Sequence, residues 1–135
     1  MFTALLASLA IVSATSTSFT FEDRTPKQLV EEFAGYCMHD GSVVSMTDSQ
    51  LVCEVNLTRT QKVNYLFRNF RQRSYTDQVR HIVTFTAIPS GEGSIGQLRE
   101  HVEAQIGSQT RTSELDMNRR GSSNIVMVNM GGVPN

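Results

Sequence analysis

Residues 78–89, QVRHIVTFTAIP, set the architecture of this chain of 135 residues. They are rich in Val, Ile, Thr and Phe, a composition typical of a β-strand. A glycine-containing turn, SGEG at 90–93, follows. After it, apolar and polar side chains alternate to residue 106, and Gly107-Ser108 is a two-residue hairpin signal. The sequence therefore predicts an antiparallel meander of three strands, at 79–89, 97–106 and 109–115.

The middle strand of this meander has a competing interpretation. Ile95, Leu98, Val102 and Ile106 would also share one face of a helix that begins near Ser94. The hairpin signal that follows favours the strand, because it requires strands on both of its sides.

Upstream of the meander, residues 26–38 predict a helix. Thr25 is a good N-cap, Pro26 fits the first helical position, and Gln28 can complete a capping box. Gly41 ends the helix. Its apolar residues recur at helical spacing and define one face: Val30, Phe33, Ala34 and Cys37.

Residues 42–57 predict a hairpin, since apolar and polar side chains alternate from Leu51 to its end. A second capping box at Thr58 and Gln61 predicts another helix, although part of it also alternates like a strand. We expect the core face of this helix to comprise Val63, Leu66, Phe67 and Phe70, with Tyr65 pointing away. A last helix is predicted within 116–130, before Gly131-Gly132.

These elements define an α+β fold, with an antiparallel sheet of about five strands packed by two to three helices. The expected order is α-β-β-α-β-β-β-α. All of them belong to a single domain at 25–135, of a size that can bury a modest core.

The N-terminal residues predict the compartment. Residues 1–14 are uncharged and almost continuously apolar, and Val12-Ser13-Ala14 is a small-residue cleavage pattern. The apolar run is too short to span a bilayer, which takes about 20 residues. We therefore expect a signal segment at 1–14, a Ser/Thr-rich linker at 15–24, and a periplasmic or secreted protein. The alternative is an apolar N-terminal strand or helix of a domain that is not exported.

Two cysteines agree with export. Cys37 falls at the end of the first predicted helix and Cys53 in the second strand of the hairpin that follows. A disulfide between them would stabilise the fold by about 3 kcal/mol on the chain-entropy model. The alternative is two buried free thiols that act as small apolar side chains.

One charge cluster is evident in an otherwise balanced chain of 12 basic and 13 acidic residues. The segment 59–73 holds five basic residues and no acidic one. As a contact surface for phosphate, lipid headgroups or an acidic protein, it would use Lys62, Arg68, Arg71 and Arg73. Alternatively it is a solvated face, balanced by acidic residues elsewhere in the fold, such as Glu31, Glu32 and Asp40. The balanced net charge argues against a nucleic-acid-binding domain.

The sequence contains no recognisable catalytic, cofactor or metal motif. His39, His81 and His101 lack the spacing of metal ligands. The glycines after the 79–89 strand match neither phosphate-binding motif. Glu100 and Glu103 would face opposite sides of a strand. We expect no cofactor, no metal and no catalysis, unless the fold brings a histidine and a carboxylate together in a pocket.

Several segments resemble small bacterial exported and lipoprotein-like proteins, some of them from phage or mobile elements. These segments are the helix at 25–37, LVCE at 51–54, EAQ at 103–105, TRTSEL at 110–115 and MGG at 130–132. The resemblance implies an α+β domain and assigns no activity. The chain departs from lipoproteins at Thr15, where a lipid-bearing cysteine would follow Ala14.

We therefore expect an exported, non-catalytic accessory or binding protein of the bacterial envelope, whose partner is a protein or another envelope component. One alternative is an intracellular or phage-encoded adaptor that binds an anionic partner through 59–73. The other is an enzyme whose catalytic residues are too dispersed to recognise in one sequence.

Overall fold

The structure is a computed structural model that describes residues 16–117 and 122–135. The predicted signal segment at 1–14 lies outside the described residues. In chain order the elements are β1 (Thr17–Phe21), α2 (Pro26–Asp40), β2 (Gly41–Met46), β3 (Gln50–Val55), α3 (Arg59–Phe70), β4 (Val79–Ser90), β5 (Gly93–Ile106), β6 (Gln109–Glu114), α4 (Ser122–Asn129) and β7 (Val133–Pro134).

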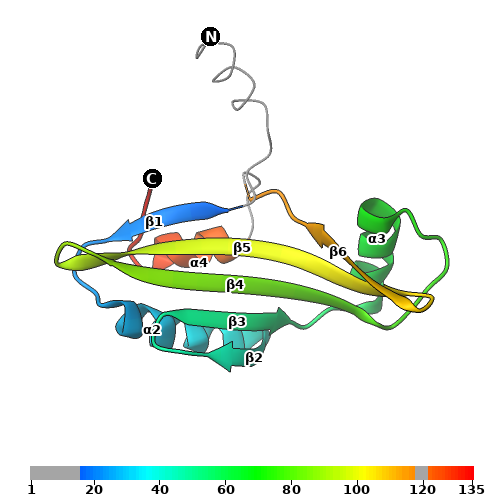
Figure 1. The fold of residues 1–135 in the computed structure, drawn as a ribbon, viewed down its shortest axis with the longest axis horizontal. Coiled ribbons are helices and arrows are strands. Elements are labelled where there is room, and N and C mark those ends of the chain that lie inside the picture. The colour runs from blue at the N-terminus through cyan, green and yellow to red at the C-terminus, as the bar shows by residue number, and fades with distance from the viewer. Residues whose placement is uncertain (1–15, 118–121) are drawn as a thin grey trace, which may run out of the picture.

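The strands form one antiparallel sheet, ordered β2-β3-β4-β5-β1-β7, with β6 paired to the remaining part of the β5 edge. The long β4–β5 hairpin runs the length of the molecule (Figure 1). Its turn pairs Ser90 with Gly93, and this register places His81 opposite Val102 and Val83 opposite Glu100. That single turn sets which residues of β4 and β5 lie opposite each other, and therefore which side chains share a face.

The described helices pack on the same face of the sheet. Figure 1 shows α2 and α4 behind the strands, and α3 at the end of the molecule where β6 lies. Helix α2 contacts four strands, from β2 to β5, whereas α3 contacts β4, β5 and β6. The position of each helix along the sheet therefore decides how much of the helix surface the strands cover.

Two hydrophobic clusters fill the space between the helices and the sheet. The larger lies under α2 and α4 and is centred on Phe33, Phe85 and Met127. The rings of Phe33 and Phe85 meet at a centroid distance of 4.9 Å. The smaller cluster lies under α3 and joins Leu66 and Phe70 to the strand residues Val79, Val102 and Ala104. The core is therefore divided along the length of β4 and β5.

The disulfide prediction is confirmed. Cys37 and Cys53 are bonded, with their Cα atoms 6.0 Å apart, within the roughly 7 Å that a disulfide can span. Both residues are buried in the larger cluster. The bond fixes the last turns of α2 to β3, the strand next to the edge strand β2.

Most predicted elements are confirmed, and the segment at 97–106 is a strand, as expected. The predicted count of about five strands and the predicted order are wrong, because β1 and β7 were missed. The predicted linker at 15–24 contains β1, in which Phe19 and Phe21 point into the core while Ser and Thr alternate with them. Its Ser/Thr content disguised a short strand that pairs with β5.

The predicted core face of α3 is wrong in part. Leu66 and Phe70 are buried, but 44% of Val63 and 60% of Phe67 are exposed. Tyr65, expected to point away, is half-buried and contacts His81. The apolar stripe of this helix is wider than the strip of sheet that covers it.

Within residues 16–117 and 122–135, no helix is both long enough and apolar enough to cross a membrane.

Candidate functional site

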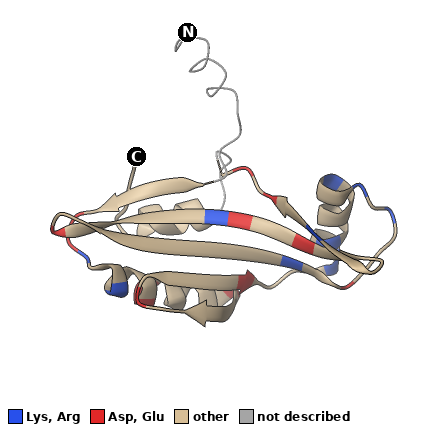
Figure 2. Ribbon diagram, in the orientation of Figure 1, with Lys and Arg blue, Asp and Glu red and all other residues tan. Residues whose placement is uncertain are grey.

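The candidate surface lies on α3 and the loop that follows it. In Figure 2, several Lys and Arg positions, blue on the ribbon, lie at this end of the molecule. We call Arg68, Arg71 and Arg73 the basic surface. All three are exposed. They follow one another over the last turn of α3 and the start of the loop, so their charges are carried on one short stretch of chain.

The two other cations of the segment are held against the loop that leads to β4. The guanidinium of Arg59 lies 3.9 Å from the centre of the Tyr75 ring. The Lys62 ammonium donates a hydrogen bond of 3.1 Å to the carbonyl of Asp77. The hydroxyl of Tyr75 donates to the Asp77 carboxylate, which raises the pKa of Tyr75. Lys62, predicted as part of the contact surface, is thus partly engaged in positioning this loop.

The arginines of the basic surface have different surroundings. Among the described residues, no carboxylate lies within ion-pair distance of Arg68, Arg71 or Arg73. Glu32, expected to balance them, pairs instead with Arg24 at the start of α2. All three side chains are exposed, and Glu32 does not balance them.

The backbone of Arg71 is also unusual. Arg71 ends α3 with φ 54° and ψ 36°, a left-handed conformation, and its N–H is bonded to the carbonyl of Leu66. It is the one non-glycine residue with positive φ in the described part of the chain. Glycine is the usual residue at this position, because a side chain there costs about 1 kcal/mol or more. An arginine thus stands where local backbone preference favours glycine.

A second cluster lies at the border between the two hydrophobic clusters. His81 and Glu100 face each other diagonally across β4 and β5, with Nε2 of His81 2.6 Å from Oε1 of Glu100. The Tyr65 hydroxyl is 3.2 Å from Nδ1 of His81. Ser123 of α4 donates its hydroxyl hydrogen to the other oxygen of Glu100. One series of polar contacts thus joins α3 to α4 over the face of the sheet on which both helices pack.

Burial and charge act in opposite directions on these groups. Burial would raise the pKa of Glu100, yet the hydrogen bonds from His81 and Ser123 hold it below its usual value. Burial and the nearby charge of Glu100 raise the pKa of Tyr65. Glu100 is therefore an ionised carboxylate held by two donors inside the fold.

This arrangement is not a nucleophile triad. Ser123 donates to the carboxylate and not to the imidazole, so His81 is not placed to accept its proton. His81, Glu100 and Ser123 line neither the hollow beside Thr17 and Asn124 nor the one beside Arg80 and Glu103. The chemistry that the cluster supports is structural: a satisfied polar link between two apolar clusters.

The sequence contained a signal for this cluster that we missed. Glu100 is in phase with Leu98, Val102 and Ala104, the apolar side of β5. His81 is in phase with the buried Val79 and Val83 of β4. A histidine and a carboxylate at apolar-face positions of two neighbouring strands indicate a buried pair once the hairpin register is known.

The opposite face of the sheet carries an exposed charge network. Arg80 of β4 bridges Glu54 of β3 and Glu103 of β5, and His101 lies 2.9 Å from Glu103. Arg99 pairs with Glu114 of β6. Glu100 and Glu103 thus face opposite sides of β5, as predicted. His39 lies exposed at the end of α2, and the three histidines share no site. No group of potential metal ligands occurs in the part of the chain that the structure describes.

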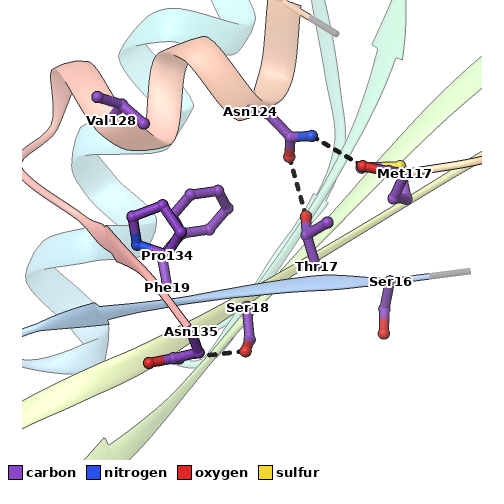
Figure 3. A pocket seen from close by; sticks show the side chains of 9 residues that line it. All are labelled: Ser16, Thr17, Ser18, Phe19, Met117, Asn124, Val128, Pro134 and Asn135. Atoms are coloured by element: carbon purple, nitrogen blue, oxygen red, sulfur yellow. Dashed lines mark hydrogen bonds between the residues drawn. The ribbon is translucent and has the colours of Figure 1, made fainter. Parts of the chain in front are cut away.

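A hollow of about 450 Å³ lies between β1, α4 and β7 (Figure 3). Uncharged residues line it. Asn124 links Thr17 to the carbonyl of Met117, and Asn135 bonds Ser18 and Thr20. These amides are occupied by contacts within the fold, which makes the hollow a poor candidate for specific recognition.

Comparison with protein-family models, curated proteins and solved structures finds no match for this chain.

Proposed function

We propose that the protein is an exported, non-catalytic binding module of the bacterial envelope, which holds an anionic partner on the basic surface of α3. The Cys37–Cys53 disulfide supports export, because such bonds persist mainly in oxidising compartments. The apolar, uncharged residues 1–14 and the resemblance to exported bacterial proteins agree with it.

The observation that carries the binding proposal is the exposure of the three arginines and the backbone conformation of one of them. They are exposed, they lack carboxylate partners among the residues described, and one of them occupies a left-handed position that glycine would fill at lower cost. Surface charges without partners are common, but an arginine kept in an unfavourable backbone conformation supports a role for its side chain.

An intracellular or phage-encoded adaptor would use the same surface. Intact-mass measurement of the natively expressed protein separates the two proposals. Loss of the N-terminal segment and of two hydrogens at Cys37 and Cys53 supports the exported module. A full-length, reduced chain would favour the adaptor.

Retention on a sulfonate cation-exchange resin tests the surface itself. The whole protein carries a net charge of −1 at pH 7, so retention at that pH requires a local cluster of positive charge. The test variant is Arg68→Gln with Arg71→Asn, because asparagine tolerates the left-handed conformation. The matched control is Lys27→Gln with Arg99→Gln, which removes the same net charge from α2 and β5.

We expect wild type and the control to be retained at low salt and the test variant to pass through. Equal elution of all three proteins would contradict the proposal. Thermal melts of both variants check that each is folded, and surface changes of this kind shift stability by about 0.5 kcal/mol or less.

A further inference from the structure

We infer that the anionic partner is a phospholipid bilayer, onto which α3 docks with Phe67 and Val63 among the headgroups and the basic surface on the phosphates. This inference rests on the proposed function and names its partner.

The first argument is the exposed apolar pair. Val63 and Phe67 are one helical turn apart on α3 and are 44% and 60% exposed. Arg71 follows Phe67 by about one helical turn, so an apolar and a cationic side chain lie together at the outer end of the helix. A partner bound by charge alone would leave the Phe67 ring in water. The boundary between headgroups and acyl chains accepts both kinds of side chain at once.

The second argument is shape. Helix α3 lies at one end of an elongated molecule (Figure 1), so a flat surface can reach it without touching the rest of the sheet. The surface is therefore open to a broad, flat partner.

The third argument is the distribution of charge. Glu22 and Asp23 follow β1, and Glu92 lies in the β4–β5 turn, which the pairing of Phe21 with Ser94 brings close to them. All three are exposed at the end of the molecule opposite α3 (Figure 2). Arg24 and Lys27 follow Glu22 and Asp23, so the far end carries both signs of charge, whereas the basic surface carries three cations. An anionic bilayer therefore attracts the α3 end more strongly, which orients the protein before contact.

A single-stranded nucleic acid fits these observations less well. Such partners stack successive bases on several aromatic side chains along a basic groove. The α3 end exposes one open ring, Phe67, because Arg59 covers the ring of Tyr75. A single ring flanked by arginines fits insertion among headgroups better than a row of stacked bases.

The test is co-sedimentation of the full chain with vesicles of phosphatidylcholine alone or mixed with phosphatidylglycerol. We expect binding to the mixed vesicles only. Arg68→Gln with Arg71→Asn should weaken it about 30-fold, since each basic residue near an anionic surface contributes about 1 kcal/mol. Phe67→Ser should weaken it roughly tenfold, as part-burial of an aromatic ring predicts. Lys27→Gln with Arg99→Gln should bind like wild type.

The Phe67→Ser variant separates this inference from the proposed function. It keeps every charge, so it should elute from the sulfonate resin with wild type while it loses vesicle binding. If the resin distinguishes the arginine variant but vesicles do not bind, or bind Phe67→Ser as well as wild type, the lipid inference is overturned and the binding module stands. Tighter binding to a single-stranded oligonucleotide or to polyglutamate than to vesicles would also overturn it. If the resin fails to distinguish the variants, both proposals fall.

Discussion

Helices α2 and α3 begin with the same type of N-terminal cap, but the sheet buries them to different extents. Each is capped by a threonine whose side chain accepts from the N3 backbone, while the N3 glutamine reaches back to the cap. Each has apolar residues at the spacing of one helical face. Yet α2 buries its whole stripe, whereas α3 buries Leu66 and Phe70 and exposes the rest.

The difference comes from the sheet and not from the helices. Helix α2 lies across β2 to β5 and is bonded to β3 by the disulfide. Helix α3 lies at the open end of the β4–β5 hairpin, away from its turn, where β6 is a short edge strand. The part of an apolar stripe that the sheet leaves uncovered remains available to a partner outside the chain.

The sharpest test of this comparison substitutes one phenylalanine in each helix. Phe33→Ala in α2 should lower the free energy of unfolding by about 3–5 kcal/mol, the usual cost of emptying a buried aromatic site. Phe33 is 4% exposed and packs on Phe85. Phe67→Ala in α3 should change it by about 0.5 kcal/mol or less. Urea unfolding of both variants gives the two values, and a large cost at Phe67 would mean that α3 is better covered than described.

The polar link between the two clusters predicts a dependence of stability on pH. The pKa of Glu100 in the folded protein lies below its usual value of 4.5. The unfolded chain therefore takes up a proton more readily than the folded one. The contribution of Glu100 is fully present above pH 4.5 and is lost as the pH falls through the lower folded pKa.

Glu100→Gln should remove this part of the acid sensitivity and cost about 1–3 kcal/mol at neutral pH, because His81 and Ser123 lose a charged acceptor. Glu103→Gln, on the exposed face of the same strand, is the matched control and should keep the wild-type slope. Thermal melts between pH 3 and 7 measure the slope near the carboxylate range. An unchanged slope in Glu100→Gln would show that other carboxylates carry the effect.

Much of this architecture could be predicted from local signals. The meander at 79–115 and the two capped helices follow from periodicity, turn residues and caps. Strand β1 could not be recognised by composition, because its Ser and Thr residues resemble a linker, and only pairing with β5 reveals its two inward phenylalanines.

The candidate sites were also only partly predictable, because some of their features are local in sequence and others depend on how the chain packs. The basic residues were visible because they lie close together in sequence. The exposure of Phe67 was not, since a stripe shows which residues share a face but not how far a neighbour covers it. The pairing of His81 with Glu100 follows from the register of one hairpin, whereas the contact with Ser123 depends on where a later helix packs.

A small gain in stability is expected from a substitution at the end of α3. Arg71→Gly should raise the free energy of unfolding by about 0.5–1 kcal/mol, because glycine adopts the left-handed conformation without a steric cost. The matched variant Arg73→Gly, which removes the same charge from the next part of the loop, should not stabilise the protein. Urea unfolding distinguishes the two.

The same pair of variants links that gain to binding. Both should elute from the sulfonate resin earlier than wild type, since each loses one cation of the basic surface. A more stable Arg71→Gly that binds less well would mean that this position gives up stability for charge. If Arg71→Gly is more stable and elutes with wild type, the arginine contributes nothing that glycine lacks, and the basic surface would be reduced to Arg68 and Arg73.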